Sequence, residues 1–164
     1  MSRSILPKAV TAIAFFAALT VTADAGVDVH IDKTTQRMYV AVDGVTRYVW
    51  NVSTGAGGYD TPSGSFRPFR MERKHFSREW DNAPMPHSIF FTDQGHAIHG
   101  SFHTRSLGQP ASHGCVRLAP RHARKLFDLV SRTGLEEASI TVSGAYASAA
   151  TSLAGDVVDA ATVY

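Results

Sequence analysis

The 164-residue sequence has one cysteine, little net charge and no apolar run long enough to span a bilayer. A single cysteine, Cys115, excludes a disulfide within the chain. The formal net charge of +2 and the lack of basic runs with interleaved aromatic residues argue against nucleic acid as a partner. The apolar run Ala9–Val21 is shorter than the about 20 residues that a transmembrane helix needs.

The first 25 residues have the three parts of a secretory signal peptide. Arg3 and Lys8 precede the apolar run, and Ala23-Asp24-Ala25 fits a cleavage site. A retained membrane anchor is the alternative, but the shortness of the run favours cleavage after Ala25. Cleavage would reduce the 16 basic and 14 acidic residues to 14 and 13. We expect an exported protein of the periplasm or cell envelope, held to a membrane only if the signal is retained.

The rest of the chain has the length of one ordinary domain. We predict that residues 26–144 form it and that residues 145–164, rich in Ala, Ser and Thr, are a C-terminal tail of unassigned function. Alternating or strand-forming residues predict strands at residues 27–32, 37–43, 45–52, 65–70, 88–92, 97–99 and 138–143. Asp43-Gly44 is a hairpin turn between the second and third strands.

One helix is predicted after Ala119. Apolar residues recur there with helical spacing, Pro120 suits its start and Gly134 suits its end. Residues 71–87 show no clear period, and we predict a long insertion that forms a lid or binding wall. Together the elements predict a mainly β domain, with a closed or sandwiched sheet and one main helix.

The most informative residue is the lone thiol. An unpaired cysteine in an oxidising compartment risks oxidation, which argues that Cys115 is kept for its reactivity. It lies in Ser112-His113-Gly114-Cys115, sixteen positions after His99, which begins a His-Gly pair. A free thiol titrates near ~8.5, so a nucleophile at neutral pH needs an imidazole or another positive centre. A small buried hydrophobic residue is the alternative that these neighbours disfavour.

The order of the elements makes a further prediction. Cys115 is expected just ahead of the helix, so that outward N–H groups and the positive end of the helix would favour both a thiolate and an oxyanion.

At these residues the chain resembles the L,D-transpeptidases of the bacterial cell wall (YkuD-like), whose catalytic domain carries His-Gly followed by Ser/Thr-His-Gly-Cys. The likeness extends to Val52–Gly55 and Thr61–Phe66 and covers roughly Val27–Ser143. The two histidine-glycine elements at this spacing are a specific signal, whereas Thr-Pro-x-Gly alone is a common turn. The resemblance implies the family's β-sandwich or closed-sheet fold, with its helix after the cysteine.

The resemblance also implies roles for site residues. Cys115 would be the nucleophile and His99 the general base, oriented by a backbone carbonyl, here that of Gly100. The backbone N–H groups of His113, Gly114 and Cys115 would form the oxyanion hole. The lack of a side chain at Gly114 would let a carbonyl come close.

Two further residues are candidates for substrate binding. Ser112 is one, and Arg117 is the other, at a position where some family members carry Asn. The Arg117 guanidinium could hold a substrate carboxylate or brace the loop against an internal acceptor. His113 is similarly open between contact with substrate or Cys115 and packing within the loop. Trp80 and His96 are candidates for the pocket wall.

The implied reaction is acyl transfer in two steps, without a cofactor. Cys115 would attack the third residue of a peptidoglycan stem tetrapeptide, release the terminal D-alanine and form a thioester, which an amine of a second stem would resolve as a 3–3 cross-link. Water as acceptor would make an L,D-carboxypeptidase, and another cysteine amide hydrolase or acyltransferase acting on peptidoglycan is also open. The resemblance further implies acylation of Cys115 by carbapenem-type inhibitors. The oligomeric state is not predicted.

Two alternatives belong to other classes. His96, His99, His103 and His113 crowd around Cys115 with spacing that superficially suits a metal. Gly95 and Gly100 argue against a rigid helical pair of ligands, and the Glu of a His-Glu-x-x-His protease is absent. The second alternative is a non-catalytic wall-binding module, against which every position that the chemistry requires is present.

Overall fold

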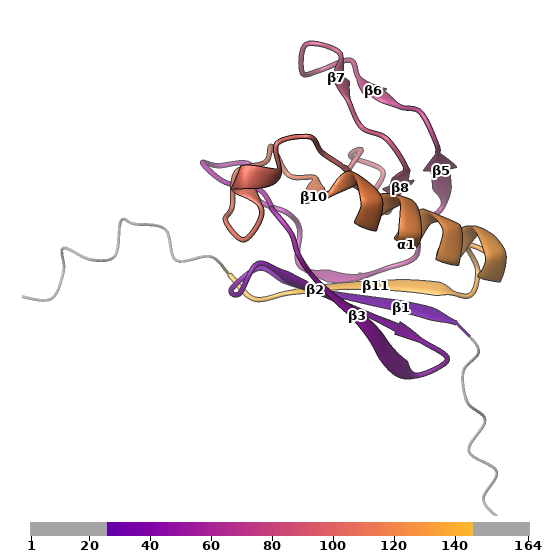
Figure 1. Ribbon diagram of the computed structural model, residues 1–164. Coiled ribbons are helices and arrows are strands. Elements are labelled where there is room, and N and C mark those ends of the chain that lie inside the picture. The colour runs from indigo at the N-terminus through magenta and orange to yellow at the C-terminus, as the bar shows by residue number, and fades with distance from the viewer. Residues whose placement is uncertain (1–25, 146–164) are drawn as a thin grey trace, which may run out of the picture.

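A computed structural model describes residues 26–145, which form two main sheets and one α-helix (Figure 1). The alternating sequence of Val27-Asp28-Val29-His30-Ile31-Asp32 becomes strand β1 (Val27–Asp32), in which the three apolar residues are buried and Asp28 and His30 are exposed. The predicted signal peptide, residues 1–25, and the predicted tail from residue 146 onward lie outside the described residues.

Strand β1 is central in a five-stranded sheet of order β3-β2-β1-β11-β4. Its members are β2 (Arg37–Val42), β3 (Val45–Asn51), β4 (Gly64–Phe66) and β11 (Ala138–Ser143). The predicted hairpin turn joins β2 to β3, with Asp43 and Gly44 at φ values of 52° and 72°. β11 lies parallel to β1, so the first and last strands of the described chain are neighbours in the middle of this sheet.

The second sheet has the order β10-β9-β8-β5. Its strands are β5 (Arg70–Glu72), β8 (Ser88–Phe90), β9 (Ala97–Gly100) and β10 (Val116–Leu118). β9 and β10 are parallel, while the other pairs are antiparallel. A 3₁₀ turn, η1 (Thr104–Ser106), lies in the long connection from β9 to β10.

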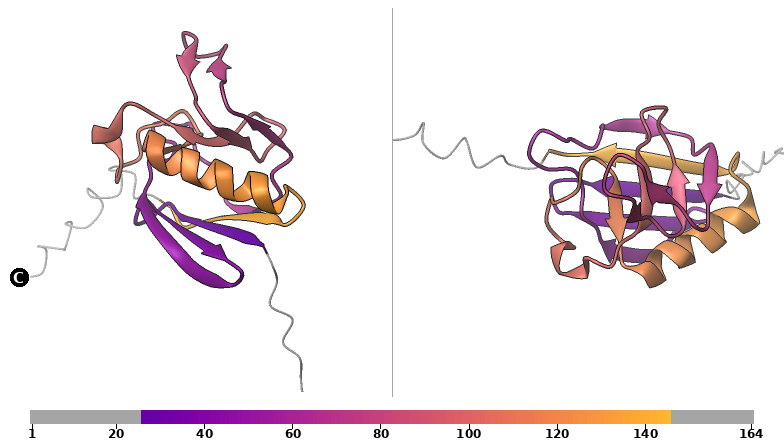
Figure 2. Two further views of the ribbon diagram at one scale, coloured as in Figure 1. Left: turned by 45° about the vertical axis from the view of Figure 1, so that its right-hand side comes forward. Right: turned by 90° about the horizontal axis from the view of Figure 1, so that it is seen from above.

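Helix α1 (Pro120–Thr133) packs against both sheets, with most of its contacts on β9 (Figure 2). Ala123, Leu126, Phe127 and Val130 form its buried stripe, as the helical spacing predicts. The helix begins at Pro120, and Gly134 follows its last residue, with a φ of 105° that suits a glycine. α1 is too short and too polar to cross a bilayer, and no other helix of residues 26–145 could do so.

Two predicted segments differ from the structure. The single strand predicted at 65–70 is two strands, because the chain breaks at buried Pro68 and passes from β4 in one sheet to β5 in the other. The insertion predicted at 71–87 contains its own hairpin, β6 (Phe76–Ser77) and β7 (Ala83–Pro84), which projects from the second sheet (Figure 1). We call residues 73–87 the flap.

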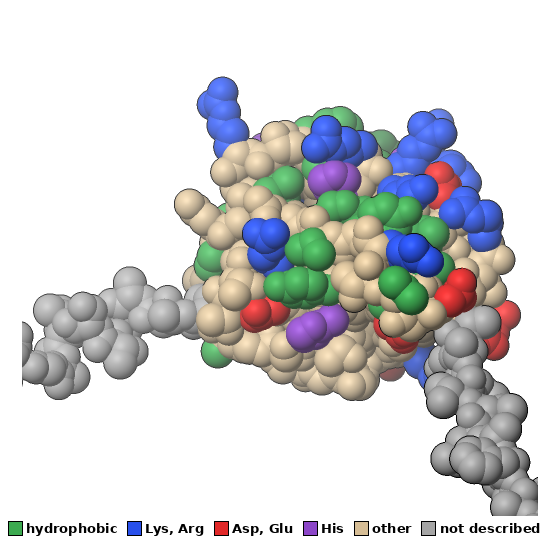
Figure 3. Space-filling view, turned by 60° about the horizontal axis from the view of Figure 1, so that its bottom comes forward, with side chains coloured by type: hydrophobic (Ala, Val, Ile, Leu, Met, Phe, Trp, Pro, Cys, Tyr) green, Lys and Arg blue, Asp and Glu red, His purple; other side chains and the backbone are tan. Residues whose placement is uncertain are grey.

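The face seen in Figure 3, toward the outside of the five-stranded sheet, carries basic, acidic and apolar side chains that are interspersed. No broad area of one charge is visible on that face, in keeping with the low net charge of the sequence.

The observed fold is mainly β with one α-helix, which is the fold class that the sequence predicts.

The buried stripe of α1 provides a test of the core. Leu126 is fully buried, and Leu129, one turn of the helix away, is only partly buried. We expect Leu126→Ala to reduce the free energy of unfolding by about 3 kcal/mol, because it removes buried methyl groups and leaves a cavity. Leu129→Ala should cost about 1 kcal/mol. Urea denaturation followed by circular dichroism measures both, and equal losses would contradict the packing described here.

Candidate active site

The parallel pairing of β9 and β10 brings the two motif residues to one face of the sheet. Arg117 lies opposite His99 in the register, and Val116 lies opposite Ile98. Because successive side chains of a strand alternate between faces, Cys115 shares the face of Arg117 and His99. Val116 and Ile98 point the other way, into the core.

A pocket at this face is lined by Cys115, His99 and the other predicted side chains of the site. Ser112, His113 and Arg117 line it, together with Ser101, Phe102 and His103 of the connection after β9. Residues of the flap complete the lining of this pocket, among them Trp80 and Met85. The structure thus gathers residues from two motifs and the insertion around one thiol.

His99 is held by the carbonyl next to it in the chain. Its Nδ1 lies 2.8 Å from the carbonyl oxygen of Gly100, and since a carbonyl can only accept, Nδ1 carries the proton and Nε2 is free to take one. This carbonyl is the orienting group that the family resemblance implies. The N–H of Gly100 in turn donates to the carbonyl of Pro86 at 2.8 Å, which anchors the end of β9 to the flap.

Burial determines the charge state of His99. His99 is only 6% exposed, and its pKa is lowered from 6.5 to about 4. Burial is the main cause, the positive charge of Arg117 contributes to the lowering, and the hydrogen bond with the Gly100 carbonyl opposes it. His99 is therefore neutral at physiological pH, which is the state that a general base requires.

Burial acts on the thiol in the opposite sense. It raises the pKa of Cys115, while the backbone of Ala97 and the charge of Arg117 lower it by less. The Sγ also makes a long hydrogen bond of 3.9 Å to the carbonyl of Gly95. The resting site therefore holds a neutral thiol and a neutral imidazole in one pocket, rather than a preformed ion pair.

The predicted contribution of the helix to the site is wrong. Strand β10 and Ala119 lie between Cys115 and the start of α1 at Pro120. Leu118, at the far end of β10, pairs with Gly100, so the helix begins at the opposite end of the strand from the thiol. A helix dipole acts within about one turn of its end, so it does not account for the reactivity of Cys115.

The loop before Cys115 uses one of its predicted oxyanion donors internally. The N–H of Gly114 donates to the Oγ of Ser112 at 3.2 Å, and that hydroxyl donates to the carbonyl of Cys115. Among the described residues, no hydrogen bond involves the N–H of His113 or Cys115. Two of the three predicted donors thus have no partner among the described residues, and the Ser112 hydroxyl braces the loop while the residue also lines the pocket.

Gly114 occupies a position that only glycine suits. Its φ is 103°, and a side chain there would come within 2.9 Å of Nε2 of His96. The turn it makes separates the exposed His113 from Cys115 at the edge of β10. The backbone conformation and the neighbouring His96 thus require glycine here, and the close approach of a substrate carbonyl stays a prediction.

Among the described residues, the side chain of Arg117 makes one hydrogen bond. Its Nη1 donates to the carbonyl of Ala111 at 3.0 Å, and the guanidinium also lines the pocket. Partial burial lowers its pKa, and the neighbouring Cys115 opposes this. The bracing role that the sequence left open is therefore present, alongside a position suited to contact with substrate.

The flap contacts the loop of the nucleophile through aromatic rings. Trp80 stacks on His113 with ring centroids 3.7 Å apart and planes within 5°, and Tyr59 meets both rings edge-on. His113 thus contacts both Trp80 of the flap and Tyr59 of the glycine-rich loop. Tyr59 was not predicted as a site residue; the one signal for it is an aromatic side chain in a glycine-rich loop.

The histidines with metal-like spacing are not assembled as a metal site. In residues 26–145, no three side chains of His, Cys, Asp or Glu are grouped to hold one ion. The Nδ1 of His96 pairs with the Thr92 hydroxyl at 2.7 Å, and that of His99 with the Gly100 carbonyl.

Residues 26–158 match the family model described as the L,D-transpeptidase catalytic domain. The chain belongs to this family. No curated protein sequence matches this L,D-transpeptidase domain significantly.

Solved structures resemble the domain in fold. An L,D-transpeptidase from Mycobacterium smegmatis has 24% identity and a TM-score of 0.66, over 73% of this chain and 59% of its own. One from Stackebrandtia nassauensis has 30% identity and a TM-score of 0.62, over 73% and 56%. The LD transpeptidase LdtMt1, solved with imipenem, has 22% identity and a TM-score of 0.64, over 72% and 59%. This chain therefore spans less than two thirds of each of these proteins.

The buried imidazole makes stability depend on pH. The pKa of His99 is about 4 in the folded protein and about 6.5 when unfolded, so the unfolded state binds a proton first as pH falls. We expect the L,D-transpeptidase domain to lose about 3 kcal/mol of stability from this group between pH ~6.5 and ~4. Urea denaturation across this range measures the loss.

His99→Gln provides the comparison. His87, His96 and His122 also have lowered pKa values, so they add to the slope in both proteins. The difference between the wild type and H99Q isolates His99, and the variant should have the shallower dependence. Identical slopes would show that His99 is not buried in its neutral form.

Proposed function

We propose that this domain is a cysteine acyltransferase that acts on peptidoglycan stem tetrapeptides and forms 3–3 cross-links. The main support is the placement of Cys115 and His99 on one face of β9 and β10, in one pocket. The hydrogen bond from Nδ1 of His99 to the Gly100 carbonyl gives the imidazole the tautomer of a base. Membership of the L,D-transpeptidase family supports the class of reaction.

In the first step, the thiol proton moves to Nε2 of His99 as Sγ attacks the carbonyl of the third stem residue. The oxyanion would accept hydrogen bonds from the free N–H groups of Cys115 and His113. The C–N bond to D-alanine then breaks, its amine takes the proton from His99, and a thioester remains on Cys115. The low pKa of His99 favours rapid return of that proton.

In the second step, an acceptor amine attacks the thioester carbonyl and loses a proton to His99. The C–S bond then breaks, the product leaves as an amide, and the proton passes from His99 to the Cys115 thiolate. Two pockets meet at Cys115. One is lined by His99, Arg117 and Phe102, and the other by charged flap residues such as Glu79. Room on both sides of the thiol suits two stem peptides, and this favours an amine as acceptor.

The L,D-carboxypeptidase remains the second candidate function. The thioester would then be hydrolysed, because water enters from the open pocket on the flap side. Both functions use the same first step and differ in the acceptor alone. We also propose that the protein acts after export, in the periplasm or cell envelope, where such a substrate is found.

The first step is tested by removal of the thiol. We expect Cys115→Ala to abolish release of D-alanine from purified stem tetrapeptides, because no other group in the pocket can form the thioester. The products of the wild type, separated by mass, identify the acceptor: cross-linked dimers indicate transpeptidation, and tripeptides indicate hydrolysis. Undiminished release by a folded C115A protein would rule out this mechanism.

The same thiol should react with carbapenems. A related structure was solved with imipenem, and the pocket here presents an accessible Sγ beside free N–H donors. We expect intact-protein mass spectrometry to show one imipenem adduct on the wild type and none on Cys115→Ala. An adduct of equal yield on both proteins would place the reaction elsewhere.

A further inference from the structure

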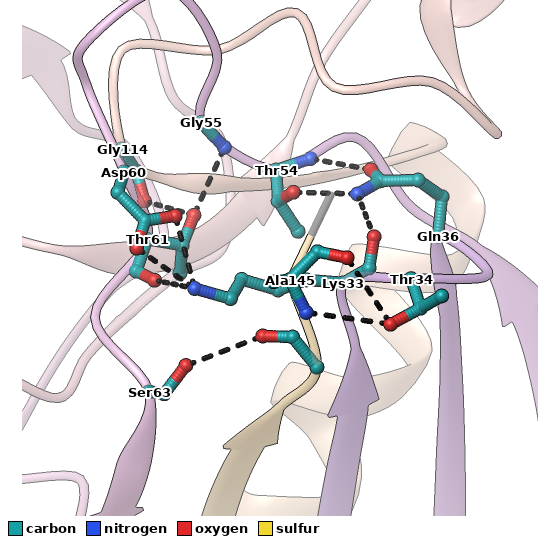
Figure 4. Close-up of polar contacts among 11 residues, drawn as sticks. Lys33, Thr34, Gln36, Thr54, Gly55, Asp60, Thr61, Ser63, Gly114 and Ala145 are labelled. Atoms are coloured by element: carbon teal, nitrogen blue, oxygen red, sulfur yellow. Dashed lines mark hydrogen bonds and ion pairs between the residues drawn. The ribbon is translucent and has the colours of Figure 1, made fainter. Parts of the chain in front are cut away.

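A buried lysine that does not line the pocket anchors the segment before β4. Lys33, in the turn after β1, is only 3% exposed. Its Nζ donates to both carboxylate oxygens of Asp60, at 2.9 and 2.8 Å, and to the carbonyl of Thr61 at 2.8 Å (Figure 4). All three ammonium protons are therefore used, and residues 60 and 61 are held at one point.

The side chain of Thr61 points from this anchor toward the loop of the nucleophile. Its Oγ1 accepts a hydrogen bond from the N–H of Gly55 at 2.9 Å and donates one to the carbonyl of Gly114 at 2.8 Å (Figure 4). Thr61 is fully buried, so water cannot replace either bond without a structural change. The hydroxyl is the one side-chain group of the described residues that bonds the Gly114 carbonyl.

The carbonyl of Gly114 and the N–H of Cys115 belong to the same peptide group. In a trans peptide these two groups point in opposite directions, and the described chain contains no cis peptide. A bond that fixes the carbonyl on the Thr61 side therefore fixes the N–H on the other side. That N–H has no partner among the described residues and is one of the two available oxyanion donors.

We propose that Thr61 is a positioning residue for acyl transfer, which holds the N–H of Cys115 toward the developing oxyanion. The inference rests on the proposed acyl-transfer function of Cys115. Gly114 has a φ of 103° and no side chain, so its peptide can rotate more freely than others in the loop. The anchored hydroxyl restricts that rotation before the substrate arrives, and Lys33 with Asp60 keeps the hydroxyl in place.

The test compares two reactions of the same thiol. In acylation by imipenem, Sγ bonds to the lactam carbonyl carbon, the ring C–N bond breaks, and the thiol proton ends on the ring nitrogen, by way of an oxyanion. Alkylation by iodoacetamide displaces iodide and forms no oxyanion. A group that orients an oxyanion donor should therefore affect acylation and leave alkylation unchanged.

The variants are chosen to separate positioning from folding. Thr61→Val removes the hydroxyl at nearly constant volume, and Thr61→Ser retains it. Thr54→Val is the matched control, because Thr54 is also fully buried and its hydroxyl bonds to Gln36 rather than to Gly114. Both valine variants should lose some stability from an unpaired buried group.

We expect T61V to be acylated about 10- to 100-fold more slowly than the wild type, with its alkylation rate within about twofold. T61S should recover most of the acylation rate, and T54V should keep both rates. Equal slowing of both reactions in T61V would show a merely structural role and overturn the proposal, as would unchanged acylation.

The outcome is separable from that of the proposed function. Wild-type protein that imipenem acylates but that releases no D-alanine contradicts the stem substrate and leaves the Thr61 comparison valid. Wild-type protein that is alkylated but never acylated has no working oxyanion site, and it overturns the inference about Thr61.

Discussion

The parallel pairing of β9 and β10 is the contact on which the candidate site depends. It sets Arg117 opposite His99 and so places Cys115 on the same face, sixteen residues later in the chain. Because parallel neighbours need a crossover, the connection must leave the sheet and return. The part of this connection that returns to the sheet is fixed by hydrogen bonds to residues 52–54. The carbonyl of Val52 accepts one from the N–H of Gly108, and the carbonyl of Thr54 accepts two, from the N–H groups of Ala111 and Ser112. The loop of the nucleophile is thus held at both ends.

Burial at this contact keeps both reacting groups uncharged at rest. It lowers the pKa of His99 to about 4 and raises that of Cys115, so an ion pair would be costly before a substrate is bound. In the proposed reaction, charge would appear only as the thiol attacks, when the imidazolium and the oxyanion form together. In such a site, donors fixed in advance would have a large effect because they need no reorganisation as the charge forms. The rate of the proposed reaction would therefore depend on how firmly the surrounding loops hold these donors in place.

The sequence predicts the features that depend on local pattern. Alternation in β1, the Asp43-Gly44 turn and the apolar stripe of α1 all arise from near neighbours, and so were foreseen. Strand β10 was missed because three residues, Val116 to Leu118, lie directly before the helix signal at Pro120. The hydrogen bond from Thr61 to Gly114 joins residues 53 positions apart, and no local pattern reports it. The roles of the site residues stay predictions, now with defined geometry.

Steric limits show why the two family-like motifs act as one unit. A side chain on Gly55 would lie 1.7 Å from the carbonyl oxygen of Tyr59, and one on Gly114 would contact His96. Thr61 bonds to the backbone of both glycines, and so joins two positions at which a side chain would clash with neighbouring residues. The segment from Val52 to Ser65 and the Ser-His-Gly-Cys segment are therefore interdependent. Within these segments, the bond from the Thr61 hydroxyl to the Gly114 carbonyl is the contact that bears on the peptide group preceding the nucleophile.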